Sequence, residues 1–318
     1  MPLLPPTPLL PIAALAALIA ALPAFAHPHP EVGEVEEPGQ ELPEKSPGEK
    51  FLRFEEGKRG QGGTLETSIT TYENAAGQRV DLIGAVHIAD RQYFHDLNRR
   101  FAGYDALLYE MVKPEGAAAP KPGRKMGADQ PMVANLQLAM KNALELDYQL
   151  DGIDYQAPNF VHADMDAATF MQMQDDRGEG MLDMILKSIL NPPEVDPDAP
   201  QLGLVDIINA MQAPDRARQL KLLMAGQMSQ MDQMLQMLDG PDGSVIVTER
   251  NKVAMKVLDE QLEGGAEDVG IFYGAAHLPD LEQRLVARGF EQVGEPEFLI
   301  AWDLTANGDA REKRDQGE

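Results

Sequence analysis

The chain has 318 residues and contains no cysteine. This absence excludes disulfide bonds, a thiol nucleophile, thiolate metal ligands and a lipid anchor on cysteine. Apolar residues make up 43% of the chain, which is ample for a hydrophobic core. We therefore expect a protein of this size to be held together by its core alone.

Basic residues are scarce. Lys and Arg number 27 against 52 Asp and Glu, which leaves a formal net charge of −25. A surface with this charge repels the phosphates of nucleic acids and of anionic lipids. We therefore expect no nucleic-acid partner, and we interpret the acidity mainly as a source of solubility.

A long apolar run is also missing near the start of the chain. Residues 12–22 form a run of only eleven apolar residues, too short to span a bilayer comfortably. Ala24-Phe25-Ala26 then has the small-x-small pattern of a cleavage site. The sequence predicts a signal peptide over residues 1–26, export to the periplasm or the extracellular space, and no stable membrane span after cleavage.

The remaining ends are predicted to be unstructured. Residues 27–63 are rich in Pro, Glu and Gly and have few large apolar groups, which predicts a disordered linker. Residues 305–318 are charged and predict a flexible tail. One folded domain is expected between them, over residues 64–304.

The order of apolar patterns predicts an α/β fold. Two runs flank a polar turn at residues 74–77 and predict a hairpin, and a helix and a buried strand follow it. A strand, a helix and a strand within about 30 residues form a βαβ unit with parallel strands. A second group of apolar runs near the end of the chain has the same character. The expected elements are strands over 65–71, 79–86, 106–109, 269–273 and 297–302, and helices over 91–101, 247–262 and 280–288.

The fold class that we predict is a mixed, largely parallel central sheet with flanking helices. A Met-rich helical insertion over about 128–240 separates its two βα halves. Five methionines at helical spacing (Met224, Met228, Met231, Met234 and Met237) line one face of this insertion. Such a face can bind Cu(I) through thioethers or can pack against the sheet or act as a mobile lid. We favour packing or a lid over copper binding, because the other faces hold no His or Cys to complete a copper site.

One short sequence motif occurs twice. Gly84-Ala85-Val86-His87-Ile88-Ala89-Asp90 returns as Gly274-Ala275-Ala276-His277-Leu278-Pro279-Asp280, each time after an apolar run. The chain has only six histidines, so two in the same setting are not expected by chance. A neutral imidazole serves as a metal ligand or as a general base. We predict that His87 and His277 share one site at the carboxyl ends of the strands. Asp90 is expected to cap a helix and Asp280 to be an acid at a helix start, and neither is expected to be a ligand.

Three further residues are candidates for that site. Glu110 follows the apolar run of residues 106–109, which we expect to form the strand next to the first copy of the repeat. A carboxylate there is costly unless it is paired, protonated or bound to a cation. Glu249 and Arg250 open a predicted helix, and Arg250 could stabilise an oxyanion. A further pair, His162 and Asp164, has two interpretations: both bind a metal, or Asp164 caps a helix and His162 is an exposed loop residue.

The two Gly-x-x-His motifs, Tyr109-Glu110 and Glu249-Arg250-Asn251 together resemble the TraB/GumN/Tiki family. The resemblance covers residues 80–113, 247–262 and 268–304, which is the predicted α/β core. It implies a hydrolase of a wider superfamily with erythromycin-esterase-like and haem-binding ChaN-like members. Tiki-type members are described as divalent-metal-dependent proteases, and other relatives hydrolyse without metal, using a His base with Glu and Arg support.

Carried over residue by residue, His87 and His277 match the family histidines, Glu110 its glutamate and Arg250 its arginine. The Met-rich middle and the acidic linker depart from the family, so the substrate class does not transfer.

Our leading hypothesis is an exported, peptidase-like, metal-dependent hydrolase that acts on a peptide or a small molecule. His87, His277 and Glu110 would hold Zn²⁺, Mn²⁺ or Co²⁺, whose bound water ionises near neutral pH. Glu249 would be a fourth ligand or a proton shuttle. The alternatives are a non-catalytic protein that binds a peptide, or haem through His87 or His277, and a structural envelope protein in which both histidines are remnants.

Overall fold

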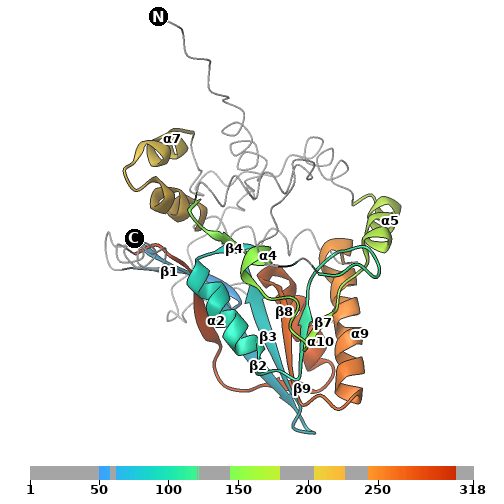
Figure 1. Ribbon diagram of the computed structural model, residues 1–318. Helices are drawn as coiled ribbons and strands as arrows, with labels where there is room; N and C mark the ends of the chain where they lie inside the picture. The colour runs from blue at the N-terminus through green and yellow to red at the C-terminus, as the bar shows by residue number, and fades with distance from the viewer. Residues whose placement is uncertain are drawn as a thin grey trace, which may run out of the picture.

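A computed structural model describes residues 50–57, 62–119, 121, 144–179, 204–225 and 243–305 (Figure 1). The predicted signal peptide, most of the predicted linker, most of the predicted tail and the methionines from Met228 to Met237 lie outside these described residues. The described part contains a mixed β-sheet with helices packed against it, which confirms the predicted α/β class.

Within the described residues the sheet has eight strands, and its main path runs β1-β2-β3-β8-β5-β7. The four strands β3, β8, β5 and β7 are parallel neighbours, whereas β2 pairs antiparallel with β1, β3, β9 and β10. The strands are β1 (Leu52–Glu56), β2 (Gly63–Asn74), β3 (Arg79–Ala85), β5 (Ala106–Tyr109), β7 (Phe160–His162), β8 (Asp268–Gly274), β9 (Phe290–Gln292) and β10 (Glu297–Asp303). A separate pair joins β4 (Ile88–Ala89) to β6 (Asp147–Tyr148).

The predicted hairpin is confirmed, and local chemistry explains its turn. The side chain of Asn74 accepts hydrogen bonds from the backbone N–H groups of Ala76 and Gln78. Gly77 has a φ of +81°, a conformation that residues with a Cβ rarely adopt. The turn therefore joins β2 to β3 in antiparallel register.

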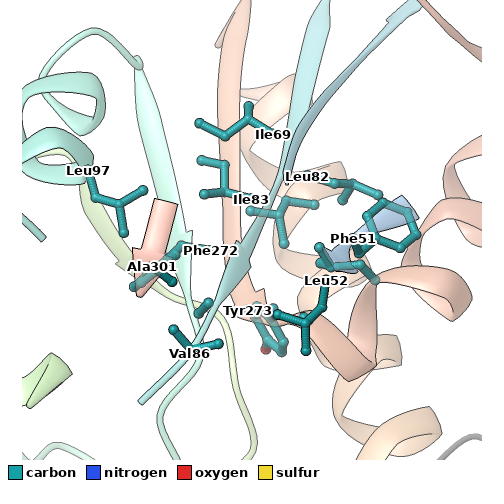
Figure 2. Close-up of a cluster of buried hydrophobic side chains, with 14 of the residues drawn as sticks. Phe51, Leu52, Ile69, Leu82, Ile83, Val86, Leu97, Phe272, Tyr273 and Ala301 are labelled. Carbon is teal, nitrogen blue, oxygen red and sulfur yellow. The ribbon is translucent and has the colours of Figure 1, made fainter. Parts of the chain in front are cut away.

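Buried side chains cover both faces of the sheet. Helix α2 (Arg91–Phe101) packs Phe101 against Phe272 of β8, with ring centroids 4.9 Å apart. Because side chains alternate along a strand, Tyr273 points to the opposite face (Figure 2). Helices α9 (Arg250–Glu263) and α10 (Leu278–Val286) pack against each other and contact the sheet.

The order of the parallel strands differs from our expectation. We placed Glu110 on the strand next to the first Gly-x-x-His copy, but β8 lies between β3 and β5. Glu110 therefore follows a strand that neighbours the second copy. The βαβ rule concerns the handedness and direction of the two strands and leaves room for a third strand between them.

The predicted boundaries of the domain also need correction. Residues 52–56, placed in the linker, form β1, and Phe51 and Leu52 are buried. The middle of the chain is not only helical, because β6 and β7 lie in it and β7 joins the main sheet. These strands have two to five residues, and β6 and β7 pair with strands that are distant in sequence.

The described part of the insertion also contains helices: α4 (Gln149–Gly152), α5 (Ala167–Arg177), α7 (Leu204–Gln212) and residues 216–225. Asp166 caps α5 by accepting bonds from the N–H groups of Ala168 and Thr169, so a helix cap at Asp164 is wrong. The buried Lys221 contacts the carboxylate of Asp90 at 3.3 Å and thereby links the insertion to the core. Within the described ranges, no helix has the length and apolarity needed to cross a membrane.

Candidate active site

The candidate site lies at the carboxyl ends of the parallel strands, where open α/β sheets bind their ligands. Glu110 follows β5, Asp164 lies two residues beyond β7, and Gly274 ends β8. His277 ends a short 3₁₀ turn, η3 (Ala275–His277), that continues from β8. Parallel pairing of these three strands thus brings together residues that are distant in sequence.

The carboxylate of Glu110 is held from two sides. Its Oε1 accepts a hydrogen bond from Nη2 of Arg250 at 2.6 Å, and its Oε2 accepts one from the backbone N–H of Gly274 at 2.7 Å. A Cβ at position 274 would lie 3.3 Å from Oε2 and 3.7 Å from the His277 ring. The glycine of the second copy therefore leaves room for the carboxylate.

Glu110 is ionised at neutral pH. Burial would raise the pKa of its carboxyl group, but His277, Arg250, His87 and the N–H of Gly274 together lower it to about 2. Arg250 supplies the permanent positive charge of the group.

Arg250 joins Glu110 to a second carboxylate, that of Asp164. Its Nε and Nη2 donate to the two oxygens of Asp164 at 2.9 and 2.6 Å, which is the bidentate geometry of a strong pair. The Asp164 side chain is completely buried, and Arg250 is 7% exposed. Burial by itself lowers the pKa of Arg250, but the two carboxylates raise it above its usual value. The sequence did not lead us to this role of Asp164, although its place just after an apolar run was a signal.

An unusual turn precedes Arg250 and places it at the start of α9, next to the site. Residues Val245–Glu249 form a π-helical turn, η2, in which the N–H of Glu249 bonds to the carbonyl of Ser244 at 3.0 Å. The turn accounts for the predicted helix over 247–262 beginning as an α-helix only at Arg250. Among the described residues, the carboxylate of Glu249 accepts from Arg177 at 2.6 Å and from Lys252 at 2.9 Å rather than joining the Glu110 group. These two cations lower the pKa of Glu249 although burial opposes them.

His277 is buried and is held through its Nδ1, which lies 2.7 Å from Oδ1 of Asn251. The amide of Asn251 also donates to the backbone oxygen of His277 at 3.0 Å and to Asp280 at 2.7 Å. Nε2 of His277 lies 3.7 Å from Oε1 of Glu110. Burial lowers the pKa of His277, and Arg250 lowers it further, against the opposing charge of Glu110. We did not predict a role for Asn251, whose only signal was its place next to Arg250.

The first copy of the repeat is built differently. His87 is exposed and lies in a bend between β3 and β4, so this copy does not pass directly into a helix. Its Nδ1 lies 3.2 Å from Oε1 of Gln149. A Cβ on Gly84 would lie 3.1 Å from the carbonyl of Phe51, so this glycine makes room for a neighbouring strand rather than for Glu110. The two copies therefore have the same residues and different environments.

The other residues singled out in the sequence lie in structural contacts. Nε2 of His162 lies 2.7 Å from the carbonyl of Met111. Asp90 precedes α2 but makes no side-chain cap, and its carboxylate accepts from Lys221 and from the N–H of Asp303. Asp280 lies in the first turn of α10, as predicted.

The described side chains do not fit a divalent cation as they stand. Both oxygens of Glu110 already accept N–H groups, and the guanidinium of Arg250 already compensates the charges of Glu110 and Asp164. Across the described ranges, no group of three or more His, Asp or Glu residues is arranged to hold a metal ion. The metal site at His87, His277 and Glu110 thus stays a prediction, and the chemistry that we derive uses the side chains alone.

Comparisons with protein-family models, with curated proteins and with solved structures found no match to this chain. The resemblance to the TraB/GumN/Tiki family therefore stays a prediction that depends on the motifs alone. A function for the chain has to be argued from the geometry of the site.

Proposed function

We propose that the protein is an exported hydrolase of peptides or small molecules, with His277 as its general base. The observation that supports the proposal is the 3.7 Å separation of Nε2 of His277 from Oε1 of Glu110, in a buried group of charges. This distance is too long for a good direct hydrogen bond but allows both atoms to contact one water molecule. A water held there has a base on one side and a carboxylate on the other.

In the proposed reaction, Nε2 of His277 takes a proton from this water while the water oxygen attacks a carbonyl carbon. The bond to the leaving group then breaks, and the leaving group takes the proton from His277. Glu110 orients the water, and its negative charge stabilises the imidazolium that forms. Because burial lowers the pKa of His277, this side chain is neutral and ready to accept a proton at neutral pH.

Arg250 and Asp164 keep Glu110 in place in this scheme. The bidentate contact with Asp164 orients the guanidinium, and its Nη2 then contacts Glu110 at 2.6 Å. A rigid surrounding shell of this kind holds catalytic groups in their working geometry. Stabilisation of an oxyanion by Arg250 and proton transfer by Glu249 remain separate proposals.

A second candidate function is the binding of haem or of a peptide without turnover. The exposure of His87 favours it, because an accessible imidazole can reach the iron of a ligand. Titration with haem would then produce a visible absorbance band that is lost in His87→Ala. A hydrolase that does not bind haem would produce no such band.

The test of the hydrolase is cleavage of a peptide library by the purified chain, with and without a chelator and with added Zn²⁺, Mn²⁺ or Co²⁺. We expect cleavage that survives the chelator and is lost in His277→Gln. His95→Gln is the matched control, because His95 lies on α2 with 63% of its side chain exposed. Loss of cleavage with the chelator would support the metal site instead. If the folded protein cleaves nothing under any of these conditions, the peptidase proposal fails.

A further inference from the structure

Nδ1 of His277 faces an amide whose orientation the structure determines. Asn251 is fully buried, and its Nδ2 lies 3.0 Å from the backbone oxygen of His277 and 2.7 Å from Oδ2 of Asp280. A carbonyl oxygen can only accept, and Asp280 also accepts two hydrogen bonds from Arg284, as a carboxylate does. Exchanging the oxygen and nitrogen of the Asn251 amide would place its oxygen against two acceptors.

The oxygen of the same amide therefore faces the imidazole. Oδ1 of Asn251 lies 2.7 Å from Nδ1 of His277, a hydrogen-bond distance at which one atom must donate. Since an amide oxygen cannot donate, Nδ1 of His277 bears the hydrogen. A neutral imidazole has only one N–H, so Nε2 presents a lone pair.

We propose that Asn251, anchored by Asp280, is a positioning residue that holds His277 as the Nδ1–H tautomer and directs the lone pair of Nε2 toward Glu110. This inference rests on the proposed role of His277 as a base. Nε2 and Oε1 of Glu110 are then both acceptors, 3.7 Å apart. A water between them donates one hydrogen to each and keeps its oxygen lone pairs for attack on the substrate. The opposite tautomer has no base at Nε2.

The test is the ¹⁵N NMR spectrum of histidine-labelled full-length protein at pH 8, recorded without substrate. Long-range ¹H–¹⁵N correlations distinguish the protonated ring nitrogen from the unprotonated one, and His277→Gln identifies the signals of His277. We expect Nδ1 to be protonated in the wild type. A wild-type His277 with its hydrogen on Nε2 would overturn the proposal.

Substitutions then test the role of the amide. Asn251→Ala should allow the second tautomer and lower kcat/KM by about 10- to 100-fold, the range known for removing a hydrogen-bond partner that orients a metal-bound histidine. Asp280→Asn should produce a mixture of tautomers, because it removes the carboxylate that orients the amide. It also provides a test if Asn251→Ala does not fold.

The matched control is Asn98→Ala. Asn98 also bridges two backbone groups, the carbonyl of Gly152 and the N–H of Asp154, but it lies in α2. Its substitution should leave the His277 signals unchanged. An unchanged tautomer in both Asn251→Ala and Asp280→Asn would also overturn the proposal. A protein with the Nδ1–H tautomer that hydrolyses nothing would instead refute the proposed function alone.

Discussion

Arg250 compensates two buried carboxylates with one guanidinium. Removing one member of such a group is costly, because the remaining charges are left in an environment that solvates them poorly. Asp164 has no exposed side-chain surface, and Glu110 has only 16%. Arg250 thus stabilises the fold and the site at once.

We expect Arg250→Met to lower the free energy of unfolding by about 3–5 kcal/mol, because it leaves two buried charges uncompensated. Urea denaturation at neutral pH measures this loss. Arg99→Met is the matched control, because Arg99 is 69% exposed and pairs with Asp96 on the surface. The control should lose less than about 1 kcal/mol. Equal losses of unfolding free energy in the two variants would contradict a stabilising role of Arg250 between Glu110 and Asp164.

Glu110 makes the stability depend on pH in a definite direction. Its pKa is lowered from 4.5 to about 2 in the folded protein, so below pH 4.5 the unfolded chain binds more protons than the folded one. The stabilisation from this group is present above pH 4.5 and is lost as the pH falls toward 2. Glu110→Gln has no such titration.

We therefore expect the free energy of unfolding of the wild type, relative to Glu110→Gln, to decrease as the pH falls from 4.5 toward 2. Urea titrations of both proteins between pH 2 and 6 provide the comparison. A difference that stays constant through this range would show that Glu110 has an ordinary pKa in the folded protein.

The η2 turn determines where α9 begins and where Arg250 points. Gly243 precedes this turn with a φ of +70°, and a Cβ there would lie 2.5 Å from Oγ1 of Thr248. π-helical turns inside or before α-helices are rare and occur often at functional sites. Gly243 thus has both a left-handed backbone conformation and a close contact with the side chain of Thr248.

Gly243→Ala should lower the free energy of unfolding by more than Gly289→Ala, by thermal or urea denaturation. Both glycines have a positive φ, and an alanine at either position costs roughly 1 kcal/mol of backbone strain. Only Gly243 also meets Thr248, since nothing lies within 4 Å of a Cβ at position 289. The two substitutions should differ in activity as well, with Gly289→Ala unaffected. Equal losses of stability in the two variants would mean that the η2 turn accommodates the added Cβ without a loss of free energy.

How well the elements could be predicted depends on their length and on their contacts. The hairpin of β2 and β3, the helix α2 and the strands β5 and β8 follow from local patterns of apolar and turn residues. β7 and β9 were missed, because each has three residues and pairs with a strand that is distant in sequence. β1 was missed although it pairs with the neighbouring β2, because charged residues interrupt the apolar residues of Leu52–Glu56. Their local residues alone do not favour a strand strongly enough.

For the molecule as a whole, the net charge of −25 is the dominant electrostatic property. Self-repulsion of like charges favours expanded states, and dissolved salt screens it over a distance of about 8–10 Å. We expect the midpoint of thermal unfolding to rise when NaCl is increased from 10 mM to 300 mM. The same rise with KCl would indicate screening rather than a specific cation. A lower midpoint at high salt would mean that attractive ion pairs outweigh the repulsion.

The sequence alone predicted most helices and strands and the residues that follow the strands, because both depend on neighbouring residues. The same patterns predicted His87, His277, Glu110 and Arg250 as members of one site. The position of β8 between β3 and β5 could not be read in this way, because the order of strands depends on packing between distant segments.

Only the tertiary structure determines which residues of the site form hydrogen bonds with each other. Arg250 meets Asp164 across 86 residues and Glu110 across 140, and His277 meets Asn251 across 26. Such contacts require particular distances and directions between donors and acceptors, which no spacing along the chain specifies. For the same reason, the two copies of the Gly-x-x-His motif have different environments. His277 is buried and is held by the amide of Asn251, whereas His87 is exposed and lies in a bend.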